Sequence, residues 1–141
     1  MKTIYTIGFS GKKQDSFLEV LDAVGIKTLI DIRAYRVARF VPWASGTNLQ
    51  NALGDRYKYM PELAPTKELL TAYKDGAFDW AGYERVFNGI LTDRQIERLF
   101  QPDDLDKVCF LCSEKTADMC HRRLVAEYLK NHFPDIEIVH L

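Results

Sequence analysis

Short apolar runs recur along the chain, at residues 3–9, 27–32, 57–60, 108–112 and 136–141. Each run is too brief for a buried helix and is rich in β-branched or aromatic residues, a combination that predicts buried strands. Gly8, Pro61 and Pro134 mark turns beside three of them. The pattern therefore predicts a sheet of about five strands.

Helical periodicity fills the stretches between these runs. Helices are expected before Gly25, over 48–53, between Thr66 and Gly76, and over 78–91. Residues 92–95 have the form of a capping box and predict a further helix that ends at Pro102. Strands that alternate with helices indicate a three-layer, Rossmann-like α/β fold with a mostly parallel sheet, here as a single domain over residues 1–141.

The stretch from 108 to 128 joins the fourth apolar run to the last helix. The run ends at Cys112, and the helix is expected to open at Met119 with Asp118 as its N-cap. Counting back along the apolar stripe of this helix puts His121 on its inner face and Arg122 beside the crevice rim. The unpaired N–H groups at such a helix start would also favour an anion.

Polar residues gather where these strands end. In a parallel sheet the carboxyl ends share one edge, and ligands bind in the crevice there. We expect four reactive side chains in this crevice: Cys112, Glu114, Cys120 and His121. We expect six further side chains to hold an anion or a substrate: Ser10, Asp31, Arg33, Arg39, Glu62 and Arg122.

Cys120 is the strongest candidate for a reactive thiol, because the helix-start dipoles, Arg122 and a charged His121 would all lower its pKa. His121 could orient a thiol or serve as an acid or base near neutral pH. The carboxylates of Asp31 and Glu114 could act as bases, bind a cation or anchor the arginines. Each residue taken singly also has an ordinary structural role, and only the cluster as a whole indicates a site.

Four motifs follow one another along the chain: Thr6-Ile7-Gly8-Phe9-Ser10, Asp31-Ile32-Arg33, Pro61-Glu62-Leu63, and Cys112-Ser113-Glu114 followed by Cys120-His121-Arg122. Together and in this order they resemble the domain-of-unknown-function family 488. The resemblance covers most of the chain and implies a small α/β protein without an established reaction. Phe9 departs from the histidine usual in the first motif. The residues after Arg33 depart from a commoner Pro/Gly/Ser-rich loop, so the resemblance does not fix the role of Arg39.

Composition narrows the classes of protein that remain. The chain has 141 residues, 47% of them hydrophobic, and a formal net charge of −1, which excludes a disordered chain and does not indicate a broad basic surface for nucleic acid. The first residues turn into a strand pattern too soon for a signal peptide, and no apolar run approaches a membrane span. Three cysteines are too few for a secreted disulfide scaffold. We therefore expect a cytoplasmic protein without a membrane partner.

Cys109 and Cys112 spell C-x-x-C, a spacing found in redox and zinc sites. On a strand, residues three apart face opposite sides of the sheet, so these two sulfurs should diverge and Cys109 should be a small core residue. A zinc site from Cys112, Cys120 and His121 has no evident fourth ligand. A cysteine phosphatase would need an arginine sooner after the strand end, whereas nine residues separate Cys112 from Arg122. We expect no metal site, and the sequence identifies no cofactor.

Two classes of function stay open. The first is a small enzyme that acts on an anionic or phosphorylated small molecule, a nucleotide among the candidates, with Cys120 or His121 as the reactive group. The second is a non-catalytic module that binds nucleotide or nucleic acid through a basic set made of Arg33, Arg36, Arg39, Lys12 and Lys13. Steep salt dependence of binding would favour the second class, and a reactive thiol would favour the first.

Overall fold

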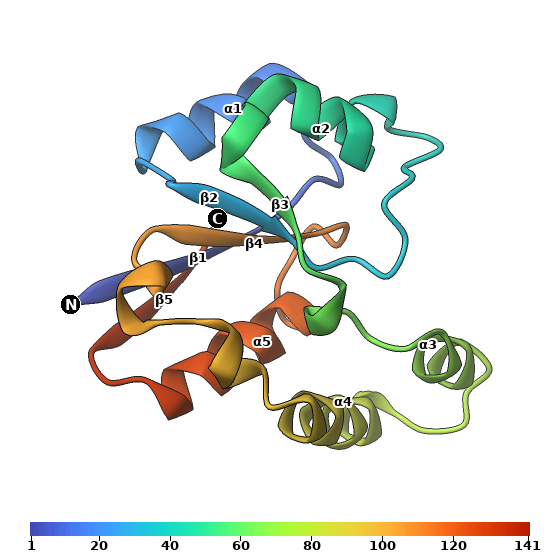
Figure 1. Ribbon diagram of the computed structural model, residues 1–141. Helices are drawn as coiled ribbons and strands as arrows, with labels where there is room; N and C mark the ends of the chain where they lie inside the picture. The colour runs from blue at the N-terminus through green and yellow to red at the C-terminus, as the bar shows by residue number, and fades with distance from the viewer.

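The computed structural model describes residues 1–141 and contains one sheet of five strands (Figure 1). The strands are β1 (Lys2–Gly8), β2 (Thr28–Asp31), β3 (Tyr57–Tyr59), β4 (Val108–Cys112) and β5 (Ile136–His140). They lie in the order β3-β2-β4-β1-β5, and every neighbouring pair is parallel. The predicted α/β class is confirmed, and the sheet is parallel throughout.

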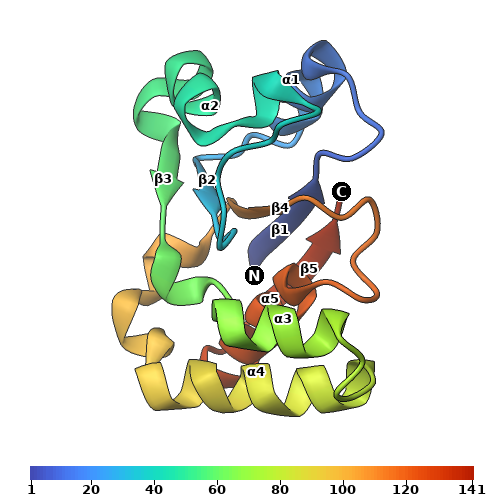
Figure 2. The same ribbon diagram turned by 90° about the vertical axis from the view of Figure 1, so that its right-hand side faces the viewer.

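Helices form the two outer layers. They are α1 (Gln14–Ala23), α2 (Gly46–Leu53), α3 (Lys67–Lys74), α4 (Trp80–Arg94) and α5 (His121–His132). Figures 1 and 2 show α1 and α2 over one face of the sheet and α3, α4 and α5 on the other side. None of them combines the length and the apolar composition that crossing a bilayer requires.

The position of β4 inside the sheet explains why its sequence is apolar throughout. Val108 and Phe110 belong to the core cluster on the side of α4 and α5, whereas Cys109 and Leu111 belong to the cluster on the side of α1 and α2. Alternate residues of a strand face opposite sides of the sheet, and here both sides are covered by helices. The prediction that Cys109 is a buried core residue is confirmed.

The connections between strands open a crevice at one edge of the sheet. The chain leaves β2 toward α2 on one face and leaves β4 toward α5 on the other, although β2 and β4 are neighbours. Neighbouring parallel strands whose connections diverge in this way leave a gap beyond their carboxyl ends, where ligands bind in open α/β sheets. The candidate site lies at this point.

The predicted start of α5 is wrong by two residues. The helix begins at His121 rather than Met119, and its N-cap is Cys120 in extended backbone, with φ −139° and ψ 140°. No side chain caps this end, so the expected role of Asp118 is also wrong.

The predicted helix start at residues 92–95 is wrong as well, because α4 continues to Arg94. The Thr92 hydroxyl donates to the Asn88 carbonyl at 2.9 Å, a bond that threonine commonly makes inside a helix. Gln95 then ends the helix in the left-handed region at φ 52°.

Candidate functional site

A cavity of about 360 Å³ lies over the carboxyl ends of β2 and β4. Its polar lining comes from the loop after β2, the end of β4 and the start of α5, through Arg33, Cys112, Ser113, Glu114, Cys120 and His121. Cys112 and His121 therefore share one crevice, as the sequence predicts. Arg33, Glu114 and Cys120 also lie there, so the predicted cluster is largely assembled around this space.

Of the six predicted binding residues only Arg33 lines the cavity, while Asp31 and Arg122 are buried and the other three lie elsewhere. The Ser10 hydroxyl donates to the Ser113 carbonyl and thereby joins the loop after β1 to the loop after β4. Glu62 and Arg39 are exposed and neither lines the cavity, and the Glu62 carbonyl accepts from Arg94 at 2.7 Å. Their positions give no support to a direct role in holding a ligand.

Arg122 is the centre of the site, although it is buried rather than at the rim. Its side chain is only 1% exposed. Its Nε donates to the Thr6 hydroxyl at 3.1 Å, and its Nη1 donates to the Glu114 carbonyl at 2.5 Å and to the Cys112 sulfur at 3.5 Å. One guanidinium thus connects β1, the end of β4, the loop beyond it and the first turn of α5.

Gly8 makes room for this guanidinium. It pairs with Cys112 across β1 and β4. A Cβ atom at this position would overlap the Glu114 carbonyl oxygen and Arg122 Nη1. The group that approaches the backbone at Gly8 is the protein's own Glu114–Arg122 pair.

The buried guanidinium favours a thiolate at Cys112. Burial alone would raise the pKa of Cys112, but the hydrogen bond donated by Cys120, together with the charge and the hydrogen bond of Arg122, lowers it below the ordinary value for cysteine. The positive charge is fixed in place because Arg122 also bonds to Thr6. Cys112 is therefore the cysteine with nucleophilic character in this site.

The pKa of Cys120 is shifted in the direction opposite to the prediction. Its hydrogen bond to Cys112 and its burial both raise its pKa, because Cys120 must keep its own proton in order to donate to the Cys112 thiolate. The expected lowering of the Cys120 pKa depended on a position inside the first helical turn, but the helix begins one residue later, at His121. Burial also raises the pKa of Cys109, which lies on the other face of the sheet.

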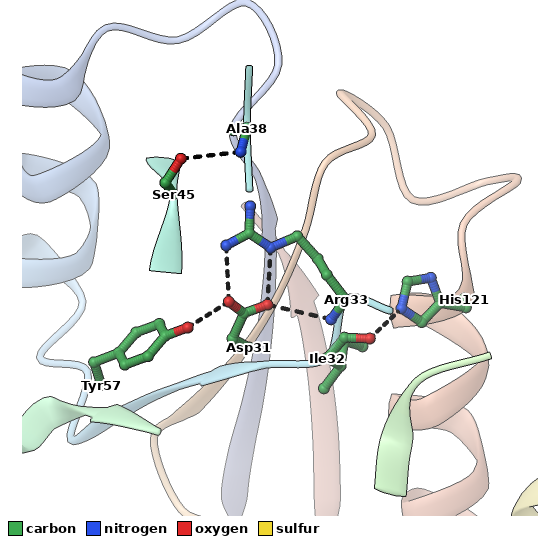
Figure 3. Close-up of polar contacts among 7 residues, drawn as sticks. All are labelled: Asp31, Ile32, Arg33, Ala38, Ser45, Tyr57 and His121. Atoms are coloured by element: carbon green, nitrogen blue, oxygen red, sulfur yellow. Dashed lines mark hydrogen bonds and ion pairs between the residues drawn. The ribbon is translucent and has the colours of Figure 1, made fainter. Parts of the chain in front are cut away.

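His121 contributes a neutral imidazole to the cavity wall. Its Nε2–H donates to the Ile32 carbonyl at 2.8 Å (Figure 3), which leaves Nδ1 without a proton in the neutral ring. Burial lowers the pKa of His121 to about 4, against a smaller opposite effect of the Ile32 bond. The ring meets Phe87 edge to face, with 5.7 Å between centroids. Nδ1 is thus a proton acceptor throughout the neutral pH range.

The Asp31 carboxylate holds the Arg33 guanidinium in place (Figure 3). Its carboxylate accepts from Arg33 Nε at 2.9 Å, from Arg33 Nη2 at 2.8 Å and from the Tyr57 hydroxyl at 2.5 Å. Burial and the bond to Asp31 raise the pKa of Tyr57 to about 12, so this hydroxyl stays a donor. Arg33 also lies over the Phe9 ring, with 5.4 Å from Cζ to the centroid. Asp31 therefore positions Arg33, whose Nη1 has no protein partner.

The helical layer supplies an aromatic wall that the sequence did not reveal, made of Tyr73, Trp80 and Tyr83. The Trp80 and Tyr83 rings stack with centroids 4.6 Å apart, and Tyr73 meets Tyr83 at 62°. Their helical spacing is typical of residues that pack into a core. The signal available in the sequence was the number of large aromatic side chains in these two helices. Aromatic rings that the core does not cover can line a cavity.

The loop after β2 forms the outer side of the cavity. Tyr35 and Val37 line it while remaining 58% and 81% exposed. The Ala38 N–H donates to the Ser45 hydroxyl at 2.9 Å, which anchors the far end of this loop (Figure 3). Arg36 points elsewhere, with its guanidinium 4.3 Å from the Tyr59 ring centroid. Of the three arginines of this loop, only Arg33 therefore lines the cavity.

No group of three or more His, Cys, Asp or Glu side chains is arranged to hold a metal ion. The chemical capacity of the site lies in a polarised cysteine and a neutral histidine acceptor, which line a mainly apolar space together with Arg33.

Comparison with known proteins gives one match. The model of the family described as "Domain of unknown function DUF488" matches residues 13–129. No curated protein and no solved structure matches the chain. The match spans α1 through most of α5 and so includes the residues that line the cavity, apart from Phe9.

Proposed function

The chain belongs to the family DUF488, and from that premise we propose that it is an enzyme whose nucleophile is the Cys112 thiolate. The family brings no reaction with it, so one observation carries the proposal: the Cys112 sulfur, at the cavity wall, lies 3.5 Å from Nη1 of the buried Arg122. A guanidinium fixed at that distance stabilises the thiolate, which is the nucleophilic form of cysteine.

The substrate is a small molecule with a planar apolar part, an electrophilic carbon and one anionic or polar group. The rings of Tyr73, Trp80 and Tyr83 offer faces and edges for the planar part. Arg33 would meet the polar group through its unpartnered Nη1. Because Asp31 already pairs with this guanidinium, a group of single charge suits the site better than a polyphosphate. A nucleobase would suit the aromatic wall, so a nucleoside derivative falls within this class.

The reaction divides into two steps. In the first, the Cys112 sulfur forms a bond to the electrophilic carbon and the bond from that carbon to the leaving group breaks, so the leaving group departs with the electron pair. In the second, the oxygen of a water molecule bonds to the acyl carbon while one of its protons passes to His121 Nδ1. The carbon–sulfur bond then breaks, so that the sulfur leaves as the thiolate and the product leaves as the acid. A neutral imidazole is ready for this role at pH 7 because the pKa of His121 lies at about 4.

The nucleic-acid alternative has less support. It relied on Arg33, Arg36, Arg39, Lys12 and Lys13 acting together. Arg33 pairs with Asp31 and Arg36 packs on Tyr59, so two of these five cations are engaged with other groups of the protein.

An aryl ester tests the proposal directly. Mixing p-nitrophenyl acetate with the protein should give a burst of p-nitrophenolate equal to the amount of protein, followed by a slower steady rate. Peptide mass spectrometry should place the acetyl group on Cys112. His121→Gln should keep the burst and lower the steady rate by about 10²-fold or more, the usual effect of losing a general base.

Cys109→Ala is the matched control, because Cys109 lies on the opposite face of the same strand. This variant should keep the burst, whereas Cys112→Ser should lose it. Acetyl groups spread over lysines, with equal release of p-nitrophenolate from Cys112→Ser and wild type, would overturn the proposed enzyme.

A further inference from the structure

Two of the three cysteines line the same cavity. Cys112 ends β4 and Cys120 is the N-cap of α5, so a loop of seven residues separates them. The hydrolytic reaction proposed above uses Cys112 alone, and it assigns no chemistry to the second sulfur.

The surroundings separate this pair from the third cysteine. Cys109 is fully buried among the apolar residues beneath α1 and α2, on the face of the sheet opposite to Cys112. No path along the cavity wall reaches it. Any oxidant that enters the cavity therefore meets Cys112 and Cys120 first.

We propose that Cys112 and Cys120 form a dithiol that a hydroperoxide oxidises to a disulfide, with Cys112 as the attacking sulfur and Cys120 as the resolving one. The geometry that carries this inference is the shared cavity wall, the short loop between the two cysteines and the guanidinium of Arg122 beside Cys112. It shares the Cys112 thiolate with the proposed function but does not depend on hydrolysis.

The chemistry balances in two steps. The Cys112 thiolate attacks one oxygen of the hydroperoxide, the O–O bond breaks, and the other oxygen leaves as an alcohol or water after taking a proton; the sulfur becomes a sulfenic acid. The Cys120 sulfur then attacks the Cys112 sulfur, and the hydroxyl leaves with the Cys120 proton as water. Two electrons pass from the two sulfurs to the peroxide, and a small-molecule thiol returns the disulfide to the dithiol.

The backbone between the two cysteines can accommodate the bond. A disulfide requires the sulfurs to approach to about 2 Å, closer than a thiol hydrogen bond. Cys120 lies in extended backbone ahead of α5, and residues 113–119 contain no helix or strand. The sulfur of Cys120 can therefore move while the helical hydrogen bonds from His121 onward are kept.

Oxidation would also change what Arg122 faces. The disulfide carries no charge, so Nη1 would lose an anionic neighbour while keeping the Glu114 carbonyl. The nucleophile of the proposed reaction would be blocked in the same event. A peroxide would thus act on this protein as an oxidising substrate and as an inhibitor of ester cleavage.

Hydrogen peroxide is the probe for the test. Reduced wild-type protein treated with an equimolar amount should lose two free thiols, and non-reducing peptide mass spectrometry should show a Cys112–Cys120 cross-link. Cys109→Ala is the matched control and should give the same cross-link. Cys112→Ala should form none.

A trap for sulfenic acid tests the order of the steps. Cys120→Ala should lose the cross-link and collect dimedone on Cys112. In case that variant does not fold, excess dimedone on wild type should divert Cys112 to the adduct and lower the yield of disulfide. A stable sulfenic acid at Cys112 beside a reduced Cys120, or no loss of thiols, would overturn the inference. A p-nitrophenolate burst without a disulfide overturns only this inference, and a disulfide without a burst overturns only the proposed hydrolysis.

Discussion

Replacing Gly8 by alanine is the sharpest test of how the site is built. The added Cβ would overlap the Glu114 carbonyl oxygen and Arg122 Nη1, and it would lie 2.6 Å from the Glu114 carbonyl carbon. Two of these atoms belong to the backbone, so the clash cannot be relieved by turning a flexible side chain alone. The loop after β4 or the strand β1 must move.

The expected loss of stability follows from these contacts. Forcing a methyl group into a filled space costs about 1–3 kcal/mol. Losing the charge-assisted bond from Arg122 to the Glu114 carbonyl adds about 1.5–3 kcal/mol. Removing a glycine from a strand returns about 0.5–1 kcal/mol. We therefore expect Gly8→Ala to lower the free energy of unfolding by about 2–5 kcal/mol, a large share of the stability of a small domain.

Urea unfolding followed by tryptophan fluorescence measures this change. Gly89→Ala is the matched control, since nothing lies within 4 Å of a Cβ added there in α4, and it should raise the free energy of unfolding by about 1 kcal/mol. Gly8→Ala should also slow alkylation of Cys112, because Arg122 is displaced from the sulfur. An unchanged unfolding curve together with an unchanged alkylation rate would refute the geometry described for Arg122.

Three further outcomes are expected. Burial lowers the pKa of His121 to about 4 in the folded protein, so as the pH falls the unfolded chain takes up this proton first. The contribution of His121 to the free energy of unfolding should be fully present above about pH 6.5 and should fall by about 1–3 kcal/mol toward pH 4. In urea titrations at a series of pH values, His121→Asn should flatten this slope. Asp31→Asn should cost about 3–5 kcal/mol in the same assay, because it leaves a buried guanidinium unpaired, whereas Asp22→Asn breaks an exposed pair and should cost less than about 1 kcal/mol. Iodoacetamide added across a pH series should label Cys112 first and Cys109 last, and labelling of Cys109 before Cys112 would contradict the assigned thiolate.

The parts of the site that the sequence could predict depend on local pattern. Cys112 ends an apolar run, and the helical repeat after it turns His121 inward; both properties are set by neighbours a few residues away. Their meeting in one crevice then follows from the rule that parallel strands end at one edge. Local pattern and one topological rule were sufficient for these two residues.

Arg122 shows where such reasoning ends. Its position beside the apolar stripe suggested a place near water, but its long side chain passes under the loop to Thr6, a residue 116 positions away in the sequence. The Gly8 backbone that admits it is equally remote. The assignment of the thiolate to Cys112 rather than Cys120 depends on that distant contact, and no repeat or spacing in the sequence encodes it.

The several attachments of Arg122 have a consequence for inactivation by heat. The same guanidinium that polarises the Cys112 sulfur also ties β1 to the loop after β4. The loop cannot open and leave a competent nucleophile behind, because opening removes the charge beside the sulfur. Reactivity toward iodoacetamide at neutral pH should therefore decline with the same midpoint temperature as the tertiary structure, instead of surviving in a partly opened form.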